Sequence, residues 1–149
     1  KYVKTFFAPD DDVIKALISE IDKAQTEINF MAYSFTHEKL VEALIRKAKA
    51  GVKISGIFEF LGATSKDGND VFRQLAQVNA ELYVYKSPNP AQSFMHHKVF
   101  IIDGKVVSTG SFNFTHNASD DNDENMLIIT STEVAGAYKQ EFEKLKPRI

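Results

Sequence analysis

The segment HHKVFIIDGKVVSTGSFN, residues 96–113, predicts a β-hairpin around which the rest of the chain can be arranged. Within residues 98–102, apolar side chains fall at both the odd and the even positions, so both faces of the expected strand are apolar. This pattern is typical of a strand that is buried on both faces. Asp103-Gly104 is a preferred pair for a tight turn, so the chain should return as a second strand through Val106 and Val107.

The first strand of this hairpin should direct two polar side chains into one site. Residues two apart on a strand share a face and lie about 7 Å apart. His96 and Lys98 are therefore expected to point the same way, with His97 pointing away from them. After the turn, Ser111 and Asn113 can return beside this pair.

The polar residues of the segment follow the spacing H-x-K-x4-D-x6-G-S-x-N. Cleavage of a phosphodiester without a metal needs a nucleophile, a proton donor and cations around the phosphoryl oxygens. Histidine exchanges protons near neutral pH, and lysine supplies a compact positive charge. Each residue alone has an ordinary structural explanation, and the turn fully explains Asp103. Their joint arrangement points to phosphodiester chemistry; its members are His96, Lys98, Asp103, Gly110, Ser111 and Asn113.

This spacing is the signature of the phospholipase D superfamily, which the sequence resembles over nearly its whole length. The resemblance is greatest to the small bacterial endonucleases that carry a single copy of the motif. Further similar stretches are YSFT at 33–36, GVKI at 51–54, TGSFNFT at 109–115 and EN at 124–125. The resemblance implies one phospholipase D-like nuclease domain over residues 1–149.

In the superfamily two motifs meet at one active site, and this chain carries one. The resemblance therefore implies a homodimer whose two-fold axis brings together His96 of each subunit. One histidine attacks phosphorus to form a phosphohistidine, and the other protonates the leaving group and then activates water. Lys98, Ser111 and Asn113 would hold the phosphate, with Asp103 and Gly110 structural. No metal or other cofactor is required.

Two glutamates also receive roles from the resemblance. Glu124 is expected to accept a hydrogen bond from the second ring nitrogen of the nucleophilic His96, which would make it part of the catalytic set. Glu59 stands where relatives often have an aspartate at a strand end. It could line the cleft, but a polar strand terminus is the favoured interpretation.

Helical and extended patterns alternate along the rest of the chain. This alternation predicts an α/β domain with a mixed, mostly parallel sheet and helices on both faces. The cleft should lie at the strand ends, within reach of residues 33–36 and of the loop 88–94. The expected helices are 14–24, 40–48 (ended by Gly51), 71–78 and 135–145, and the expected strands are 27–33, 52–60, 82–85 and 125–130.

Composition narrows the possible partners. The 149 residues carry a net charge of −2, which argues against a broad basic surface that grips duplex DNA. The absence of cysteine excludes disulfides and cysteine-bound zinc. No apolar run approaches the roughly 18 residues of a membrane span, so no membrane insertion is expected of the visible chain. The sequence starts at Lys1, which is compatible with loss of a signal peptide or anchor and thus with a periplasmic or secreted bacterial protein.

The leading hypothesis is a metal-independent endonuclease acting on DNA or RNA, with a weak preference for single strands. Tyr33, Phe94 and Phe112 could stack on bases, although a core position is favoured for each. The main alternative is hydrolysis of phospholipids such as cardiolipin by the same chemistry. A metallohydrolase using His96 and His97 is the chemical rival, and a silent binding module is disfavoured by the intact motif. The acidic runs 10–12 and 120–124 are expected to be a helix start and a solvated loop.

Overall fold

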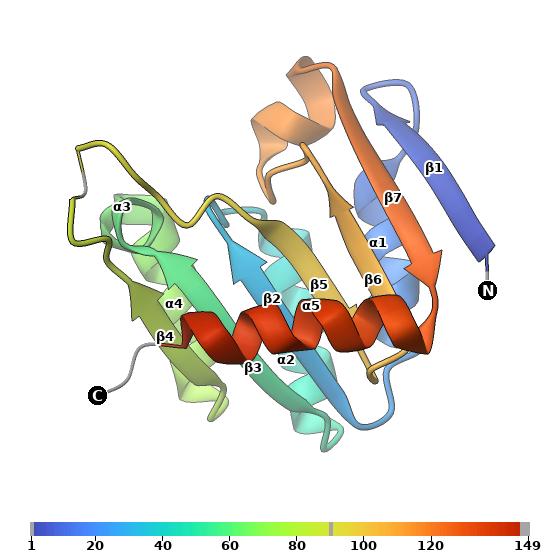
Figure 1. Cartoon of the computed structure of the whole chain (residues 1–149), viewed down its shortest axis with the longest axis horizontal. Helices are drawn as coiled ribbons and strands as arrows, with labels where there is room; N and C mark the ends of the chain where they lie inside the picture. The colour runs from blue at the N-terminus through green and yellow to red at the C-terminus, as the bar shows by residue number, and fades with distance from the viewer. Residues whose placement is uncertain (1, 90, 147–149) are drawn as a thin grey trace.

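The computed structural model describes residues 2–89 and 91–146. These residues form a seven-stranded sheet in the order β1-β7-β6-β5-β2-β3-β4 (Figure 1). Strands β2, β3 and β4 are parallel neighbours, and every other pairing between adjacent strands of the described chain is antiparallel. The strands are β1 (Tyr2–Ala8), β2 (Glu27–Ala32), β3 (Lys53–Glu59), β4 (Glu81–Tyr85), β5 (Lys98–Ile102), β6 (Val106–Gly110) and β7 (Glu124–Thr130).

The expectation of a mostly parallel sheet was wrong. The described sheet is mostly antiparallel because the hairpin, β7 and β1 all pair in antiparallel orientation. The β5–β6 hairpin adds to the β2 edge with β5 antiparallel to β2, and β7 continues the antiparallel order. Strand β1, which the sequence patterns did not reveal, then pairs antiparallel with β7.

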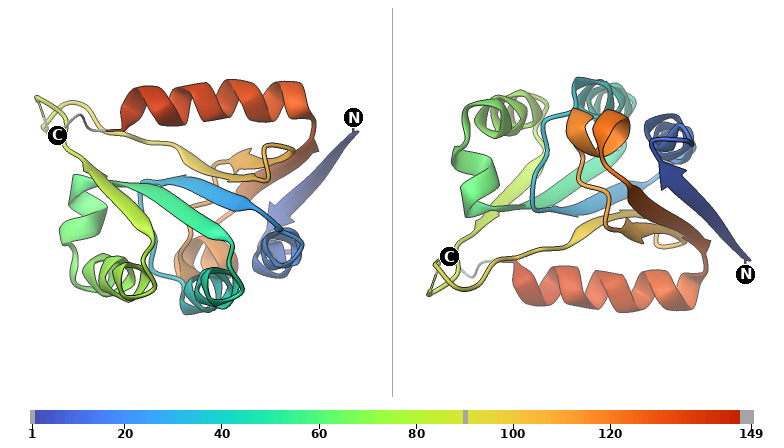
Figure 2. Two further views of the ribbon diagram at one scale, coloured as in Figure 1. Left: turned by 90° about the horizontal axis from the view of Figure 1, so that it is seen from below. Right: turned by 90° about the horizontal axis from the view of Figure 1, so that it is seen from above.

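Helices cover both faces of the sheet, as expected. Helices α1, α2 and α4 lie on one face, and α5 crosses the other (Figure 2). The acidic run before α1 begins that helix, since the Asp12 carboxylate accepts a hydrogen bond from Lys15 N. The helices are α1 (Val13–Asp22), α2 (Glu38–Lys49), α3 (Phe60–Thr64), α4 (Lys66–Gln77) and α5 (Thr132–Leu145), with a π-helical turn η1 (Asn117–Asp121) before β7.

Strand β5 divides two hydrophobic cores, because its side chains alternate between them. Phe100 packs with Phe30 and Phe35 under the helices of one face. Val99 and Ile101 belong to the smaller core beneath α5. The prediction of a strand buried on both faces is confirmed, and burial of this strand fixes the position of Lys98 at its beginning.

The turn of the hairpin is stabilised by its own backbone conformation and by hydrogen bonds from another segment. Asp103 and Gly104 have φ of 54° and 62°, the left-handed pair of a type I′ turn. The Asp103 carboxylate also accepts hydrogen bonds from the backbone of residues 25–27, which precedes and begins β2. The structural role predicted for Asp103 therefore extends beyond the turn.

Membrane insertion was not expected of this chain. Within the described ranges 2–89 and 91–146, no helix combines the length and apolarity needed to cross a bilayer. Part of the loop predicted near the cleft, Pro90, lies outside the described residues.

Candidate active site

His96 and Lys98 face the same site at the beginning of β5. The Lys98 Nζ atom lies 2.8 Å from His96 Nδ1 and 2.9 Å from the His96 carbonyl oxygen. His97 takes the opposite direction, and its Nε2 atom lies 3.2 Å from Glu141 Oε2 on α5. The predicted orientation of the three side chains is confirmed. Because the two histidines contact partners on opposite sides of the chain, this arrangement does not favour the metallohydrolase hypothesis, which used both with nearby acids and stays untested.

The surroundings of His96 favour its uncharged form. Burial lowers the pKa of His96, and the nearby ammonium of Lys98 lowers it further. Lys98 is 8% exposed, and burial lowers its pKa, while the carboxylate of Glu124 opposes that effect. A neutral imidazole beside a buried ammonium suits nucleophilic attack on a phosphate whose oxygens the ammonium can bind.

Ser111 and Glu124 form a second polar pair where β6 passes into β7. Ser111 Oγ donates to Glu124 Oε1 at 2.5 Å and accepts a hydrogen bond from Asn125 N at 3.0 Å. Gly110 permits this approach, because its φ is +148° and a Cβ atom there would lie 2.3 Å from the Asn125 carbonyl oxygen. The structural assignment of Gly110 thus has a direct steric explanation.

The hydrogen bond expected between Glu124 and His96 is not formed within the described part of one chain. His96 Nδ1 contacts Lys98, and the Glu124 carboxylate contacts Ser111 and Asn122. Glu124 nevertheless lies close enough to Lys98 to act on its charge. Its catalytic role stays a prediction.

Asn113 is held between two buried phenylalanines. Phe112 and Phe114 are each 1% exposed, and Phe114 N donates to Ser34 O at 3.2 Å. Asn113 Oδ1 is buried without a hydrogen-bond partner among the described residues. Phe112 is therefore a core residue, as favoured, and serves to fix the loop that carries Asn113.

Two aromatic side chains lie beside the histidine. The Tyr33 ring is 4.5 Å from the His96 ring, and the Phe94 ring is 5.9 Å from that of Tyr33. Lys98 Nζ lies 5.6 Å from the Tyr33 ring centre. Phe94 is 43% exposed, so the core position favoured for it from the sequence was wrong. A cavity of about 360 Å³ borders Phe94 and His96, but His97, Glu141 and Leu145 also line it, so it lies towards α5 and not between Tyr33 and Lys98.

Glu59 supports the segment that leads into His96. It is a strand terminus, as favoured, but it is only 2% exposed. Its Oε2 atom accepts a hydrogen bond from Leu61 N at 2.7 Å, and its Oε1 atom accepts one from Met95 N at 3.3 Å. Glu59 thereby fixes the residue directly before His96, a role that no local sequence signal indicates because the two segments are 36 residues apart.

Comparison with known proteins gives consistent relatives over nearly the whole chain. The family model described as "Cardiolipin synthase, PLD-like domain" matches residues 5–146. A phospholipase D of Rickettsia conorii is 34% identical over 140 residues, which are 94% of this chain and 67% of that protein. A mitochondrial cardiolipin hydrolase of Xenopus laevis is 29% identical and is matched over 91% of this chain and 61% of its own length.

Two solved structures share the fold closely. Nuc from Salmonella typhimurium, a phospholipase D family member, superposes with a TM-score of 0.89 at 29% identity, covering 97% of this chain and 93% of that one. NucT from Helicobacter pylori superposes with a TM-score of 0.88 at 27% identity, covering 97% and 94%.

Proposed function

The chain belongs to the phospholipase D superfamily and is a phosphodiester hydrolase, and from this premise we propose that it is a metal-independent endonuclease acting on DNA or RNA. The observation that carries the proposal is the contact between His96 and Lys98, with Tyr33 against the His96 ring. An imidazole, an ammonium group and an aromatic ring thus lie side by side, and we assign them the roles of nucleophile, phosphate-binding cation and stacking surface. These are the groups needed to hold a nucleotide by its phosphate and its base.

The first chemical step would be attack of the neutral His96 imidazole on phosphorus. A P–N bond forms and the P–O bond to the leaving oxygen breaks, while that oxygen takes a proton from the imidazolium of the partner subunit's His96. Lys98 would leave His96 Nδ1 for a phosphoryl oxygen, and Ser111 and Asn113 would donate to the same oxygens. In the second step water attacks phosphorus, gives its proton to the now neutral partner histidine, and the P–N bond breaks.

A homodimer follows from this proton balance. His96 cannot be neutral for attack and also charged for protonation of the leaving group. Because the chain carries one copy of the motif, a second copy of the chain related by a two-fold axis is the simplest source of the second histidine. Glu124 would then be free to contact either histidine once a phosphate displaces the present contacts.

Nucleic acid is the favoured substrate because of the aromatic pair. Phe94 is exposed beside Tyr33, and a base can stack on either ring without regard to its identity. The net charge of −2 leaves no general attraction for duplex DNA, so a weak preference for single strands is expected.

Phospholipid hydrolysis is the second candidate. It is favoured by the names of curated relatives, among them the phospholipase D of Rickettsia conorii and the mitochondrial cardiolipin hydrolase of Xenopus laevis. The same phosphohistidine chemistry would serve a lipid headgroup, with the Phe94 ring against acyl or glycerol carbons.

Cleavage assays in excess EDTA separate the two candidates. Labelled single-stranded and duplex DNA and RNA would be compared with vesicles containing cardiolipin and phosphatidylcholine. We expect strand cleavage that survives EDTA, is lost in His96→Ala and is kept in His97→Gln, whose side chain points to α5. Lipid hydrolysis without strand cleavage would replace the nuclease proposal with the second candidate. Loss of all activity in EDTA would contradict the metal-free mechanism.

A further inference from the structure

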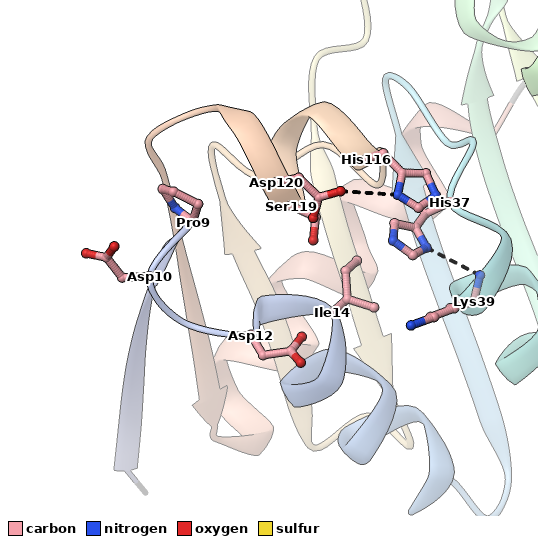
Figure 3. A pocket seen from close by; sticks show the side chains of 9 residues that line it. All are labelled: Pro9, Asp10, Asp12, Ile14, His37, Lys39, His116, Ser119 and Asp120. Atoms are coloured by element: carbon pink, nitrogen blue, oxygen red, sulfur yellow. Dashed lines mark hydrogen bonds and ion pairs between the residues drawn. The ribbon is translucent and has the colours of Figure 1, made fainter.

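A second polar cluster lies outside the His96 site, where the turn between β2 and α2 meets the start of η1. His37 caps α2, is 3% exposed, and accepts a 3.3 Å hydrogen bond from Lys39 N through Nδ1. The ring of His116 stacks on the ring of His37, with centres 4.0 Å apart and planes at 23° (Figure 3). Two of the four histidines of the chain, 79 residues apart in sequence, are thus brought together.

Two carboxylates hold the ring of His116 from either side. Glu38 Oε2 lies 2.8 Å from Nε2, and Asp120 Oδ2 lies 3.5 Å from Nδ1. Burial followed by repulsion from His116 lowers the pKa of His37, whereas the bond to Glu38 raises the pKa of His116. The surroundings therefore favour the neutral form of His37 and the charged form of His116.

The cluster is accessible from two cavities. One of about 400 Å³ is lined by both histidines together with Asp12, Ser119 and Asp120 (Figure 3). Another of about 330 Å³ is lined by Glu38 and His116 with Asp67 and Asp70. Both openings carry several carboxylates, which favour the approach of a cation.

We propose that His37, Glu38 and His116 bind a divalent transition-metal ion with the preferences of zinc. One potential ligand atom from each of these residues lies within 4.8 Å of the others. Two imidazoles and a carboxylate form a common zinc ligand set, with bonds of about 2.0–2.2 Å. The ion would replace the proton between His116 Nε2 and Glu38, and that proton would leave to solvent.

Small side-chain movements suffice for this exchange. The rings are stacked, so the His116 ring must turn before both rings can bind one ion, and its 52% exposure leaves room for the turn. The long bond from Lys39 N to His37 can be given up to water, since Lys39 is exposed. Asp120 would then hold His116 Nδ1 as a supporting carboxylate, a common partner of zinc-bound histidines.

The position of the cluster indicates a structural role. Thr36 N and His37 N both donate to Phe114 O at 2.9 Å, so the cluster lies where the β2–α2 turn is joined to the loop that carries Asn113. An ion bound here would strengthen that junction without contacting the phosphate. The inference is independent of whether the substrate is nucleic acid or lipid.

Cobalt(II) is a suitable probe because its visible absorption reports the ligand geometry, and thermal unfolding with zinc gives a second readout. We expect one Co²⁺ per chain and a Tm that rises with zinc. His116→Gln and Glu38→Gln should each weaken binding by at least about 100-fold, since loss of a supporting hydrogen-bond partner alone costs about 10–100-fold. His97→Gln and His96→Asn should bind as the wild type does.

Each variant is first shown to fold by its Tm without metal, and the exposed Glu38 provides a second test if His116→Gln fails to fold. Absence of binding to the wild type would overturn the proposal. So would binding that is unchanged in both His116→Gln and Glu38→Gln, or that is lost in His96→Asn, because the ion would then lie at the catalytic histidines.

Discussion

Replacement of Glu59 tests whether a buried carboxylate positions His96, the proposed nucleophile. The two carboxylate oxygens serve different segments, Leu61 N at 2.7 Å and Met95 N at 3.3 Å. Met95 is 3% exposed, so its N–H cannot turn to water when the acceptor is removed. Glu59→Ala should therefore loosen the segment that leads into His96 as well as the start of α3.

The expected cost can be worked from these two donors. A buried donor left without its partner costs about 1–3 kcal/mol. Glu59→Ala removes both acceptors and should lower the free energy of unfolding by about 2–4 kcal/mol, whereas Glu59→Gln keeps one oxygen and should lose about half as much. For a domain of this size, such a loss corresponds to a Tm decrease of roughly 5–15 °C.

Urea unfolding and steady-state cleavage would be measured side by side, with Glu42→Ala as the control because Glu42 is exposed on α2. We expect a lower kcat in Glu59→Ala, partial recovery in Glu59→Gln and no change in the control. If Glu59→Ala unfolds within about 0.5 kcal/mol of the wild type, the size of an ordinary surface substitution, the carboxylate does not hold Met95 in the way described. A destabilised variant with unchanged kcat would leave Glu59 structural but would refute its positioning role.

Three further predictions concern the pKa of His96, the Asp103 turn and the exposed aromatic ring. Lys98→Met should raise the pKa of His96 towards, but not to, its ordinary value of about 6.5, because burial remains; an NMR titration that finds no change would contradict the influence of Lys98. Asp103→Asn should cost about 1–3 kcal/mol at pH 7. Burial acts to raise the Asp103 pKa, but the hydrogen bonds from the backbone outweigh burial, and the net effect is a lowered pKa. The stabilisation is therefore present above the unfolded pKa of about 3.9 and disappears as pH falls through the folded pKa. The unfolding free energies of wild type and variant should thus converge when urea titrations are repeated in acid. Phe94→Ala should weaken oligonucleotide binding by roughly 5–150-fold, equivalent to about 1–3 kcal/mol of stacking, with little effect on cleavage of bis(p-nitrophenyl) phosphate; equal losses on both substrates would exclude a stacking role.

Local patterns were sufficient to predict the hairpin and the orientation of its polar residues. The two-residue period of a strand separates His96 and Lys98 from His97, and it depends on no distant part of the chain. The turn at Asp103-Gly104 is likewise determined by the backbone conformations that those two residues accept. Helices α1, α2, α4 and α5 were predicted for the same reason, although first residues were missed where capping residues set the start, as at His37 and Ser65. The short α3 and the π-helical turn η1 were not predicted.

Features that depend on pairing between distant segments were not predictable in this way. Strand β1 gains its partner only from β7, more than a hundred residues later, and leaves Tyr2, Val3 and Phe7 exposed, so it lacks a clear buried face. The error about the parallel sheet has the same origin, since the alternation of helices and strands does not reveal in which direction the hairpin runs when it pairs with β2. Phe94 and Phe112 differ in exposure although both are phenylalanines in or near the motif, so residue type and position in the sequence could not tell the exposed ring from the buried one.

The charge arrangement within one chain supports the proposed homodimer. Burial and Lys98 lower the pKa of His96 and so favour its neutral form, which in the proposed mechanism can attack phosphorus but cannot protonate the leaving oxygen. The neighbouring His97 cannot substitute, because it points to Glu141 on the opposite side of β5. Lys98 is the remaining nearby cation, and in the proposed mechanism it stays at the phosphoryl oxygens throughout the reaction. A proton donor must therefore come from outside these three residues. We propose that His96 of a second subunit supplies it, and that the shared phosphate would make one histidine neutral and the other charged although the two subunits have the same sequence.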